Sequence, residues 1–251
     1  MEGVIFSIED FAINDGPGVR TTVFLKGCSL RCQWCHNPEG QSFEIQMLKN
    51  KQGEAFECGE VISSDALAKK LLRDERIFKL NNGGITFTGG EPLAQADFLF
   101  DVISKIKGKI HVAVETSAFA KSDVFAKLVE MADLILIDNK STNSEIHKRF
   151  TGVDNFQILE NLKYLCRSNT PFILRVPLIP SVNDTLENMQ NLLEIVKNAN
   201  NLQRIELLRY HKTAGAKYYM LDKKYAPDFD VNLPPRVFDV FTKNNINCIV
   251  L

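Results

Sequence analysis

The stretch TTVFLKGCSLRCQWCHNPEG, Thr21–Gly40, contains a short β-rich run that leads directly into three cysteines. The run TTVFLKG is rich in β-branched and aromatic residues and predicts a strand over Thr21–Gly27. The cysteines follow at the carboxyl end of that strand, as Cys28, Cys32 and Cys35 with the spacing C-x3-C-x2-C. In α/β barrels and open α/β sheets, active sites lie at the carboxyl ends of the strands. This stretch therefore indicates both an α/β fold and the position of its site.

The rest of the chain alternates between short β-rich runs and amphipathic stretches. Further strands are expected at Gly84–Gly90, Lys109–Thr116, Asp133–Asp138, within Pro171–Pro180, at Gln203–Tyr210 and in the terminal run NCIVL. Helices are expected at Asp65–Phe78 after an N-cap at Ser64, then at Phe98–Gly108, Ser122–Met131, Ser144–Phe150, Asn155–Ser168, Thr185–Asn198 and after Pro234-Pro235. This alternation indicates βαβ units and a parallel sheet. Six such strands precede the terminal one, and a closed barrel needs about eight. We therefore expect an α/β fold, a partial, open (β/α)6 barrel of mostly parallel strands.

The composition is that of an ordinary soluble globular protein. Of 251 residues, 45% are apolar and 24% charged, and 30 basic and 31 acidic side chains leave a net charge of −1. The chain therefore has no excess of positive charge of the kind that attracts nucleic acid or an anionic membrane. No apolar run approaches the ~18 residues of a membrane span, and the N-terminus lacks the features of a secretory signal. We expect one domain over residues 1–251, a cytoplasmic location with reduced thiols, and an irregular segment over residues 37–61.

The three clustered cysteines favour an iron–sulfur cluster over zinc. Structural zinc takes four ligands, usually from two close pairs, whereas Cys58, Cys166 and Cys248 are isolated and His36 is poorly placed directly after Cys35. A [4Fe–4S] cluster can be held by three cysteines, which leaves one iron open for another ligand, an arrangement suited to catalysis. Zinc, or three structural thiols, are the alternatives.

The cysteine spacing resembles the signature of the radical S-adenosylmethionine (SAM) superfamily, C-x3-C-x-Φ-C, in which Trp34 takes the aromatic Φ position. The resemblance implies that the open iron chelates the methionine moiety of SAM, and that the reduced cluster cleaves the sulfonium to yield a 5′-deoxyadenosyl radical. It also implies that Trp34 and His36 contact the adenine, with core packing as the alternative for Trp34. The run TGGEPL resembles the GGE motif of the family, so that Gly89, Gly90 and Glu91 would receive the methionine amino group; a simple turn is the alternative.

Charged residues lie at or near the ends of further strands. Glu115 and Asp138 are at the ends of two neighbouring strands, Lys140 follows the second, and Arg175 lies within the fifth. A buried strand rarely keeps an unpaired charge. Each charge alone could belong to a structural ion pair, but several on one rim favour a ligand site. By resemblance, Lys140 would contact the methionine carboxylate or the ribose, Asp138 would lie near the cofactor, and Arg175 and His211 would line its pocket.

Two carboxylates on neighbouring strand ends repel each other unless a cation lies between them. By resemblance this would be Na+ or K+, bound by the side chains of Glu115 and Asp138 and by the backbone carbonyls of Thr116 and Leu136. The alternative is direct ion pairing of these acids with the basic residues named above. Glu115 is one methylene longer than the aspartate of some relatives, which would shift the ion or remove its site.

A longer resemblance narrows the family. The run FAINDGPGVRTTVFLKGCSLRCQWCHNPE is similar to the N-terminus of glycyl radical enzyme activating enzymes of the pyruvate formate-lyase activating type, and Asp15–Arg20 is characteristic of that group. ETSAF, DLILIDNK, IPSVND and IELLRYHKTAGAKYYML follow in the family's order, so the resemblance covers nearly the whole chain. It implies hydrogen abstraction from a glycine of a partner glycyl radical enzyme, a flavodoxin or ferredoxin as electron donor, and a monomer.

This chain departs from the family pattern at a few positions. Ala118 stands in place of glycine, Asn139 in place of leucine, and Arg209 in place of proline. Larger relatives carry a ferredoxin-like insert with about eight cysteines after the first motif. Residues 37–61 contain only Cys58, which indicates a short form with one cluster, held by the loop over residues 27–40.

Two other function classes stay open at this point. A radical SAM enzyme acting on a small molecule, such as a modified nucleobase precursor, would need a dedicated polar pocket, and the run Asp15–Arg20 argues against it. A non-catalytic metal-binding regulator would not need the GGE run, Lys140 and Arg175 on one rim. The glycyl radical partner could be pyruvate formate-lyase, a dehydratase or a decarboxylase.

Overall fold

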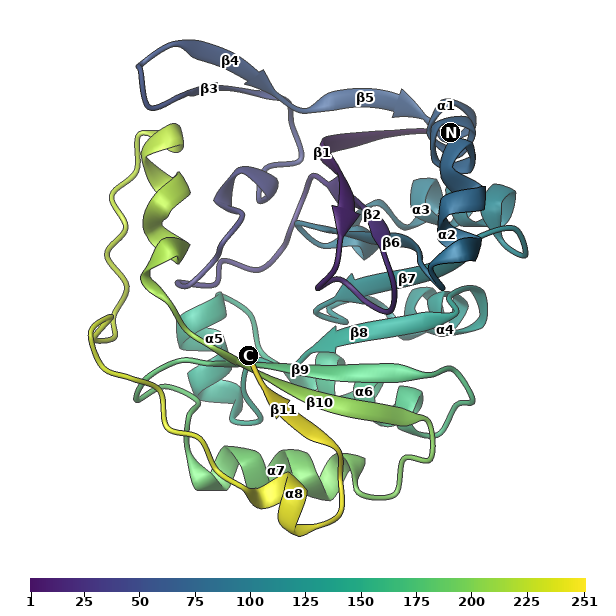
Figure 1. Cartoon of the computed structure of the whole chain (residues 1–251). Coiled ribbons are helices and arrows are strands. Elements are labelled where there is room, and N and C mark those ends of the chain that lie inside the picture. Colours follow the sequence, from purple (N-terminus) through teal and green to yellow (C-terminus); the bar gives the residue numbers. More distant parts are fainter.

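The computed structural model describes all 251 residues and is built around a nine-stranded sheet that curves into an open barrel (Figure 1). The strand order is β11-β10-β9-β8-β7-β6-β2-β1-β5. The six parallel strands are β2 (Arg20–Leu25), β6 (Gly84–Gly89), β7 (His111–Thr116), β8 (Leu134–Asp138), β9 (Phe172–Leu178) and β10 (Leu202–Arg209), and β11 (Cys248–Val250) extends them in parallel. The expected partial, open (β/α)6 barrel is confirmed. Because β5 and β11 are the two edges and do not pair, the barrel is incomplete on one side.

The sheet also has an antiparallel edge that the sequence analysis did not anticipate. Strand β1 (Glu2–Ala12) pairs antiparallel with β2 and, through its first residues, with β5 (Glu60–Ser63). The acidic side chains Glu2, Glu9 and Asp10 are exposed on β1, and they interrupt the continuous apolar run that marks the central strands.

Helices cover the outer face of the sheet. They are α1 (Ser64–Leu71), α2 (Glu75–Leu80), α3 (Ala96–Ile106), α4 (Ser122–Met131), α5 (Ser144–Thr151), α6 (Phe156–Cys166), α7 (Leu186–Val196) and α8 (Val240–Lys243), with 3-10 turns η1 (Pro38–Gly40), η2 (Leu72–Asp74), η3 (Pro92–Gln95) and η4 (Lys212–Leu221). The helix expected at Asp65–Phe78 is interrupted by η2, and its N-cap is Ser63 rather than Ser64, since the Ser63 side chain accepts a hydrogen bond from the Ala66 amide. None of the helices has the length and hydropathy that a membrane crossing requires.

The two faces of the central strands differ in chemistry. Outward side chains such as Val114, Ile135 and Leu174 belong to the main core of 39 buried residues beneath the helices. Inside the barrel, a small apolar cluster consists of Ala113, Leu134, Leu136 and Ile173. Side chains two residues further along a strand lie on the same face. Glu115, Asp138 and Arg175 stand two residues beyond Ala113, Leu136 and Ile173, respectively. The interior thus changes from apolar to charged toward the carboxyl ends of the strands.

The segment over residues 37–61 is more regular than expected, which corrects that prediction. It contains η1, a hairpin of β3 (Gln46–Lys49) and β4 (Ala55–Cys58), and the start of β5. Strands of four residues are too short to display a clear alternation, and the outward side chain of Met47 remains 67% exposed. Buried Lys26 holds the hairpin to the cysteine loop, since its ammonium donates to the carbonyls of Glu39 at 2.9 Å and Cys58 at 3.2 Å.

Candidate active site

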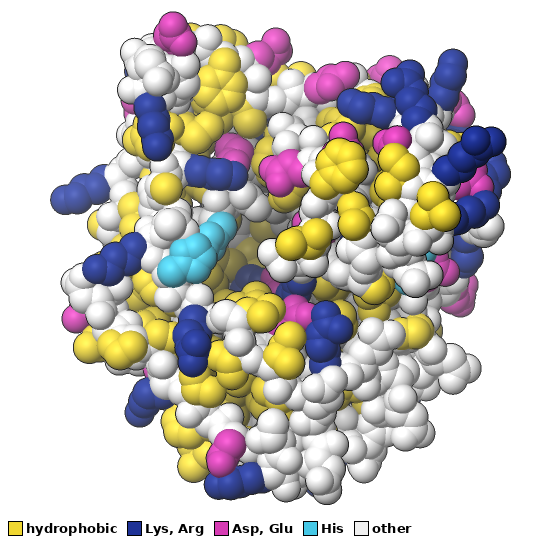
Figure 2. Space-filling model, in the orientation of Figure 1, with side chains coloured by type: hydrophobic (Ala, Val, Ile, Leu, Met, Phe, Trp, Pro, Cys, Tyr) yellow, Lys and Arg dark blue, Asp and Glu magenta, His cyan; other side chains and the backbone are white.

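A cavity of about 450 Å³ lies at the carboxyl ends of the parallel strands. Figure 2 shows this face of the molecule with its central hollow, a histidine on the left rim and hydrophobic side chains on the right. The lining residues are Cys28, Leu30, Cys32, Trp34, Cys35, His36, Asn37, Thr88, Gly89, Gly90, Glu115, Thr116, Ser117, Asp138, Lys140, Pro177, Ile179, Leu208, Arg209, Tyr210, His211 and Leu251. Most of the residues singled out from the sequence meet here, and Glu91, Leu136 and Arg175 are the exceptions.

Backbone hydrogen bonds hold the cysteine loop on both flanks. They run from Gly27 N to Gly40 O at 2.8 Å, from Arg31 N to Thr151 O at 2.7 Å, and from Gln33 N to Phe150 O at 3.0 Å. The loop is therefore fixed between η1 on one side and the carboxyl end of α5 on the other. Cys28, Cys32 and Cys35 all line the cavity from this position.

The three thiols fit an iron–sulfur cluster better than a single metal ion. No three Cys, His, Asp or Glu side chains converge closely enough to hold one ion, as a zinc site would require. A [4Fe–4S] cluster takes each thiolate on a different iron. Three cysteines spread around one cavity match that requirement.

The glycine pair after β6 allows backbones to pack closely. A Cβ on Gly90 would lie 2.3 Å from the Gly27 carbonyl oxygen and 2.5 Å from that of Gly40. Gly89 has φ of +119° and lies against Leu25. Both glycines line the cavity, but side chains are excluded here by the cysteine loop and by β2.

Glu91 lies behind the cavity wall and does not line it. Its buried carboxylate accepts hydrogen bonds from the Thr116 hydroxyl at 2.5 Å and from the Ser117 amide and hydroxyl at 2.8 and 2.5 Å. Burial raises the pKa of Glu91, and these hydrogen bonds oppose that shift. Glu91 thus joins the end of β6 to the end of β7. Ala118 then forms the turn after β7 with φ of +58°, the left-handed conformation that a glycine would adopt more easily.

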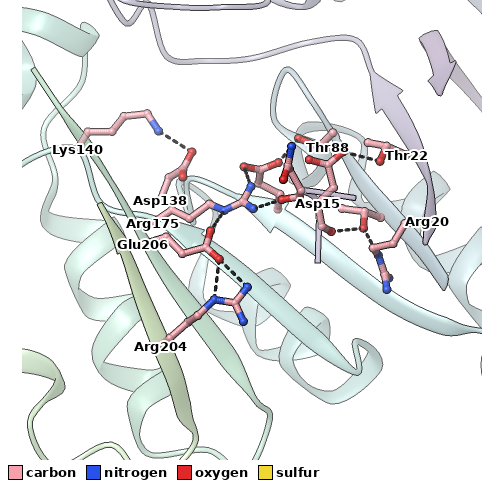
Figure 3. A network of polar contacts seen from close by, with 12 residues as sticks. Asp15, Arg20, Thr22, Thr88, Asp138, Lys140, Arg175, Arg204 and Glu206 are labelled. Atoms are coloured by element: carbon pink, nitrogen blue, oxygen red, sulfur yellow. Dashed lines mark hydrogen bonds and ion pairs between the residues drawn. The ribbon is translucent and has the colours of Figure 1, made fainter. Parts of the chain in front are cut away.

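Direct ion pairs connect the charged residues of the barrel interior (Figure 3). Arg175 Nη1 donates to Glu115 Oε1 at 2.6 Å, and Lys140 Nζ lies 3.1 Å from Asp138 Oδ2. The second oxygen of Glu115 accepts from the Thr88 hydroxyl at 3.0 Å. Arg175 is 6% exposed and lies behind Glu115, which itself lines the cavity. The pairing is the one named above as the alternative to a monovalent cation.

The ion pairs set the protonation of the cavity wall. Burial acts against the ionised form of Glu115, but Arg175 outweighs it and holds the pKa of that carboxyl below its usual value. Burial raises the pKa of Asp138, while Lys140 opposes the shift. Desolvation acts against the charge on Lys140, but Asp138 and Cys32 raise the pKa of its ammonium above the usual value. Glu115 is therefore a carboxylate, and Lys140 an ammonium, at neutral pH.

Aromatic side chains form another part of the cavity wall. Trp34 packs between Phe150 and Phe229, with both ring centroids 6.4 Å away. The rings of His36 and His211 meet edge to face at 4.9 Å. Trp34 takes part both in a small apolar cluster and in the cavity lining. A surface of this kind suits a flat heteroaromatic ring.

Comparison with known proteins agrees with this geometry. The family model for the Radical SAM superfamily matches residues 22–196, which include the cysteine loop, most of β2 and the whole of β6, β7, β8 and β9. The chain belongs to the radical SAM superfamily.

Curated relatives of this radical SAM protein include activating enzymes. The 4-hydroxyphenylacetate decarboxylase activating enzyme of Clostridioides difficile is 35% identical, over 100% of this chain and 96% of its own length. The pyruvate formate-lyase-activating enzyme of Clostridium pasteurianum is 35% identical over 89% of this chain and 88% of its own length. The chain therefore also belongs to the activating enzymes of glycyl radical enzymes.

A solved structure supports the fold. A radical SAM methyltransferase from Sphaerobacter thermophilus matches 98% of this chain and 76% of its own chain with a TM-score of 0.61. At 13% identity this match concerns the fold alone.

The radical SAM site also includes residues that the sequence analysis did not select. Ser117, Thr88, Asn37 and Tyr210 line the cavity, and Arg209, noted above only as a departure from the family, lines it too. Polar residues next to strand ends were the available signal for Ser117 and Thr88. A further buried charge, that of Glu206, occurs within an otherwise apolar run of β10. The rule that singled out Arg175 would have found it.

Proposed function

We propose that this chain is an activating enzyme that uses one [4Fe–4S] cluster and SAM to abstract a hydrogen atom from the Cα of a glycine in a partner glycyl radical enzyme. The observation that carries the proposal is the 35% identity to an activating enzyme over the whole chain, with all three cysteines of the motif on one cavity. When bound, the cluster and SAM supply the one-electron chemistry. The protein binds them, orients them and excludes water.

The cavity residues receive proposed roles from their positions. Cys28, Cys32 and Cys35 hold the cluster. The ammonium of Lys140 pairs with the methionine carboxylate, which is the anionic part of SAM. Trp34 and His36, with His211 beside them, contact the adenine.

The acidic side chains of the cavity accept hydrogen bonds from the cofactor in this proposal. Asp138 and Glu115 line the cavity and accept hydrogen bonds from hydroxyl or ammonium groups of SAM. The carboxylate of Glu91 is already bonded by neighbouring residues. We therefore propose that Glu91 fixes the glycine turn, and that the methionine amino group meets the backbone at Gly89 and Gly90.

The incomplete barrel suits a protein substrate. The edges β5 and β11 do not pair with each other, so the barrel is open along one side. A loop of a large protein can approach the cavity through such a gap, whereas a closed barrel would admit only small molecules. The open side therefore favours activation of an enzyme over turnover of a modified nucleobase precursor.

The remaining assignments extend the proposal. We expect one radical SAM domain over residues 1–251, with the cluster loop over residues 27–40 and no ferredoxin-like insert. Its alignment with the decarboxylase activating enzyme spans 306 positions, more than the 251 residues of this chain, so that relative is longer. A monomer in the cytoplasm, reduced by a flavodoxin or ferredoxin and without nucleic-acid or membrane partners, is the expected state. The relatives act with a decarboxylase or a lyase by name, and the partner is therefore proposed as a class.

A monovalent cation stays a prediction. Its ligands would be the side chains of Glu115 and Asp138 and the carbonyls of Thr116 and Leu136. The ion pairs to Arg175 and Lys140 already balance both carboxylates, which favours the alternative. The test is the affinity for SAM measured in salts of Na+, K+ and a bulky organic cation at fixed ionic strength. Tighter SAM binding in Na+ or K+ would support a monovalent cation site, and equal affinity in all three salts would show that the site is not there.

Anaerobic reconstitution tests the proposed function. We expect about four irons per chain, lost on changing any of Cys28, Cys32 or Cys35 to Ser. The same change at the isolated Cys58 should leave the iron in place. Reduced protein should convert SAM to 5′-deoxyadenosine, faster with a glycyl-loop peptide. A protein that binds zinc alone, or that never cleaves SAM, would be a regulator, and cleavage that glycyl peptides never stimulate would indicate a small-molecule substrate.

A further inference from the structure

The guanidinium of Arg175 is bonded at all three of its nitrogens (Figure 3). Nη1 donates to Glu115 Oε1 at 2.6 Å, Nε to Glu206 Oε2 at 2.8 Å, and Nη2 to the carbonyl of Asn14 at 2.5 Å. These acceptors come from β7, from β10 and from the loop after β1. The orientation of the guanidinium is thus fixed from three directions, and of its two carboxylate partners only Glu115 lines the cavity.

The other carboxylate oxygen of Glu206 binds a second arginine. Its Oε1 accepts from Arg204 Nε at 2.8 Å and lies 2.6 Å from Arg204 Nη2. Glu206 is 2% exposed, whereas the side chain of Arg204 is 34% exposed. The four residues therefore form a charge array of alternating sign, which runs from the partly exposed side chain of Arg204 on β10 to the cavity wall. Its members are Arg204, Glu206, Arg175 and Glu115.

We propose that Glu206 is a positioning residue for SAM. It fixes Arg175, and Arg175 fixes the Glu115 carboxylate toward the hydroxyl or ammonium donors of the cofactor. Arg175 and Arg204 each donate to a separate oxygen of the Glu206 carboxylate. A glutamine at this position keeps only one acceptor oxygen and no charge, so Arg175 Nε loses its charged acceptor and the guanidinium can turn away from Glu115. Glu206 itself does not line the cavity and touches no bound molecule. The inference rests on the proposed function only in placing SAM in this cavity.

Stability alone does not account for this array. Burying an ion pair costs desolvation that its attraction often fails to recover, and apolar replacements are commonly neutral or stabilising. Side chains that orient metal-ligating residues change metal affinity or activity by roughly 10–100-fold when they are removed, and we expect a residue that orients Glu115 toward SAM to act on the same scale. Orientation of Glu115 explains why the charges continue beyond the cavity wall.

The test is a binding measurement on the holoenzyme. With the cluster oxidised, SAM is bound but not cleaved, so titration calorimetry gives its affinity without any partner protein. Glu206→Gln keeps the shape of the side chain and removes its charge. We expect SAM to bind roughly 10–100-fold more weakly, with unchanged iron content. A failure of glycine activation would leave this measurement untouched, so the two proposals fail separately.

A double-mutant cycle separates positioning from a general structural effect. In a Glu115→Gln background, Glu206→Gln should weaken SAM binding by less than about twofold, because the group through which it acts is already absent. Glu194→Gln is the matched control, since Glu194 pairs with Lys197 at the surface and its loss changes the net charge equally. The control should bind SAM as the parent protein does.

Three results would overturn the proposal. One is unchanged SAM affinity in Glu206→Gln, and another is an equal loss of affinity in the Glu115→Gln background. If Glu206→Gln does not fold, Glu206→Asp takes its place, because it keeps the charge but is too short to reach both Arg175 and Arg204. Glu206→Asp should also weaken SAM binding. The third result that would overturn the proposal is a Glu206→Asp variant that binds SAM as tightly as the parent protein.

Discussion

Buried polar side chains of this protein are nearly all bonded, and Asn139 is an exception. It is 1% exposed, and neither its amide nitrogen nor its oxygen has a partner. It follows Asp138 at the end of β8, in the place where the family usually has leucine. Asn161 provides the contrast, because its equally buried amide donates to the carbonyls of Ala118 and Ala120, both at 2.9 Å.

Asn139→Leu should therefore stabilise the protein. An unsatisfied buried polar group costs about 1–3 kcal/mol, and leucine removes that cost while adding apolar contact. We expect the melting temperature to rise by about 2–4 °C for each kcal/mol gained, measured by calorimetry under anaerobic conditions. Asn161→Leu should lower it, since two carbonyls lose their donor. A fall in both variants would show that Asn139 is bonded in solution.

His147 should make stability depend on pH. It is 1% exposed, and its Nδ1 donates to the Val153 carbonyl at 2.7 Å while Nε2 has no partner. Burial lowers the pKa of His147 below its ordinary value of 6.5. Below about pH 6.5 the unfolded chain binds more protons than the native chain, so the free energy of unfolding falls as the pH falls. Above about pH 6.5 this contribution does not change with pH.

The measurement is the urea midpoint from about pH 7.5 to 5.5. His147→Gln should flatten part of the decline, because the glutamine does not titrate. Burial also lowers the pKa of His36 and His111, so a residual slope is expected. An unchanged slope in the variant would mean that His147 does not contribute.

Among the elements, the turn after β6 and the cysteine loop behave as one unit. Gly90 packs against the backbone of Gly27 and Gly40. Gly90→Ala would place a methyl group against fixed backbone atoms, and the loop must move. We expect reconstituted iron to fall to less than half of the parent value. Gly108→Ala is the control, because no atom lies within 4 Å of its Cβ and its positive φ costs only about 1–2 kcal/mol. Full iron in Gly90→Ala would contradict the close packing.

The central elements could be predicted from sequence because both of their faces are covered. The run LILI of β8 is apolar throughout, and it has neighbours on both edges and packing on both faces. Beyond Ile5, strand β1 pairs on one side only, and the two-stranded β3–β4 hairpin has open edges. Both carry exposed side chains, so their sequences have no comparable pattern. Sequence patterns report burial, and peripheral strands are only partly buried.

The candidate site could be predicted from the sequence to a similar extent. Strand ends and motif spacing brought the three cysteines, Lys140 and Glu115 to one cavity. They could not tell that Arg175 and Glu91 lie behind its wall, because that depends on which acceptors and donors neighbouring strands offer. Those hydrogen bonds link residues far apart in the chain, such as Arg175 and Asn14.

As a whole molecule, the protein has a reaction cavity that it does not enclose by itself. We expect a glycyl-loop peptide to bring the ratio of 5′-deoxyadenosine to glycyl radical close to one, since the docked peptide covers the open side and supplies the hydrogen atom. Without peptide, cleavage of SAM should be slow. Product analysis by chromatography and radical counting by EPR give the ratio.

The matched control is the same peptide with aminoisobutyrate in place of the glycine, which has no Cα hydrogen. It should cover the cavity but form no glycyl radical. Cleavage of SAM at the same rate with and without peptide would indicate that the free enzyme already excludes water. Docking would then not be linked to the chemistry.

The buried amine of Lys26 allows the packing of the cysteine loop against the β3–β4 hairpin to be followed by chemical labelling. It is 0% exposed and donates to the carbonyls of Glu39 and Cys58, which belong to η1 and β4. Reagents that acylate surface lysines cannot reach it while the cysteine loop and the hairpin are packed together. Burial also lowers the pKa of Lys26. Acylation of this one lysine, followed by mass spectrometry, would therefore time the opening of the loop when oxygen destroys the cluster.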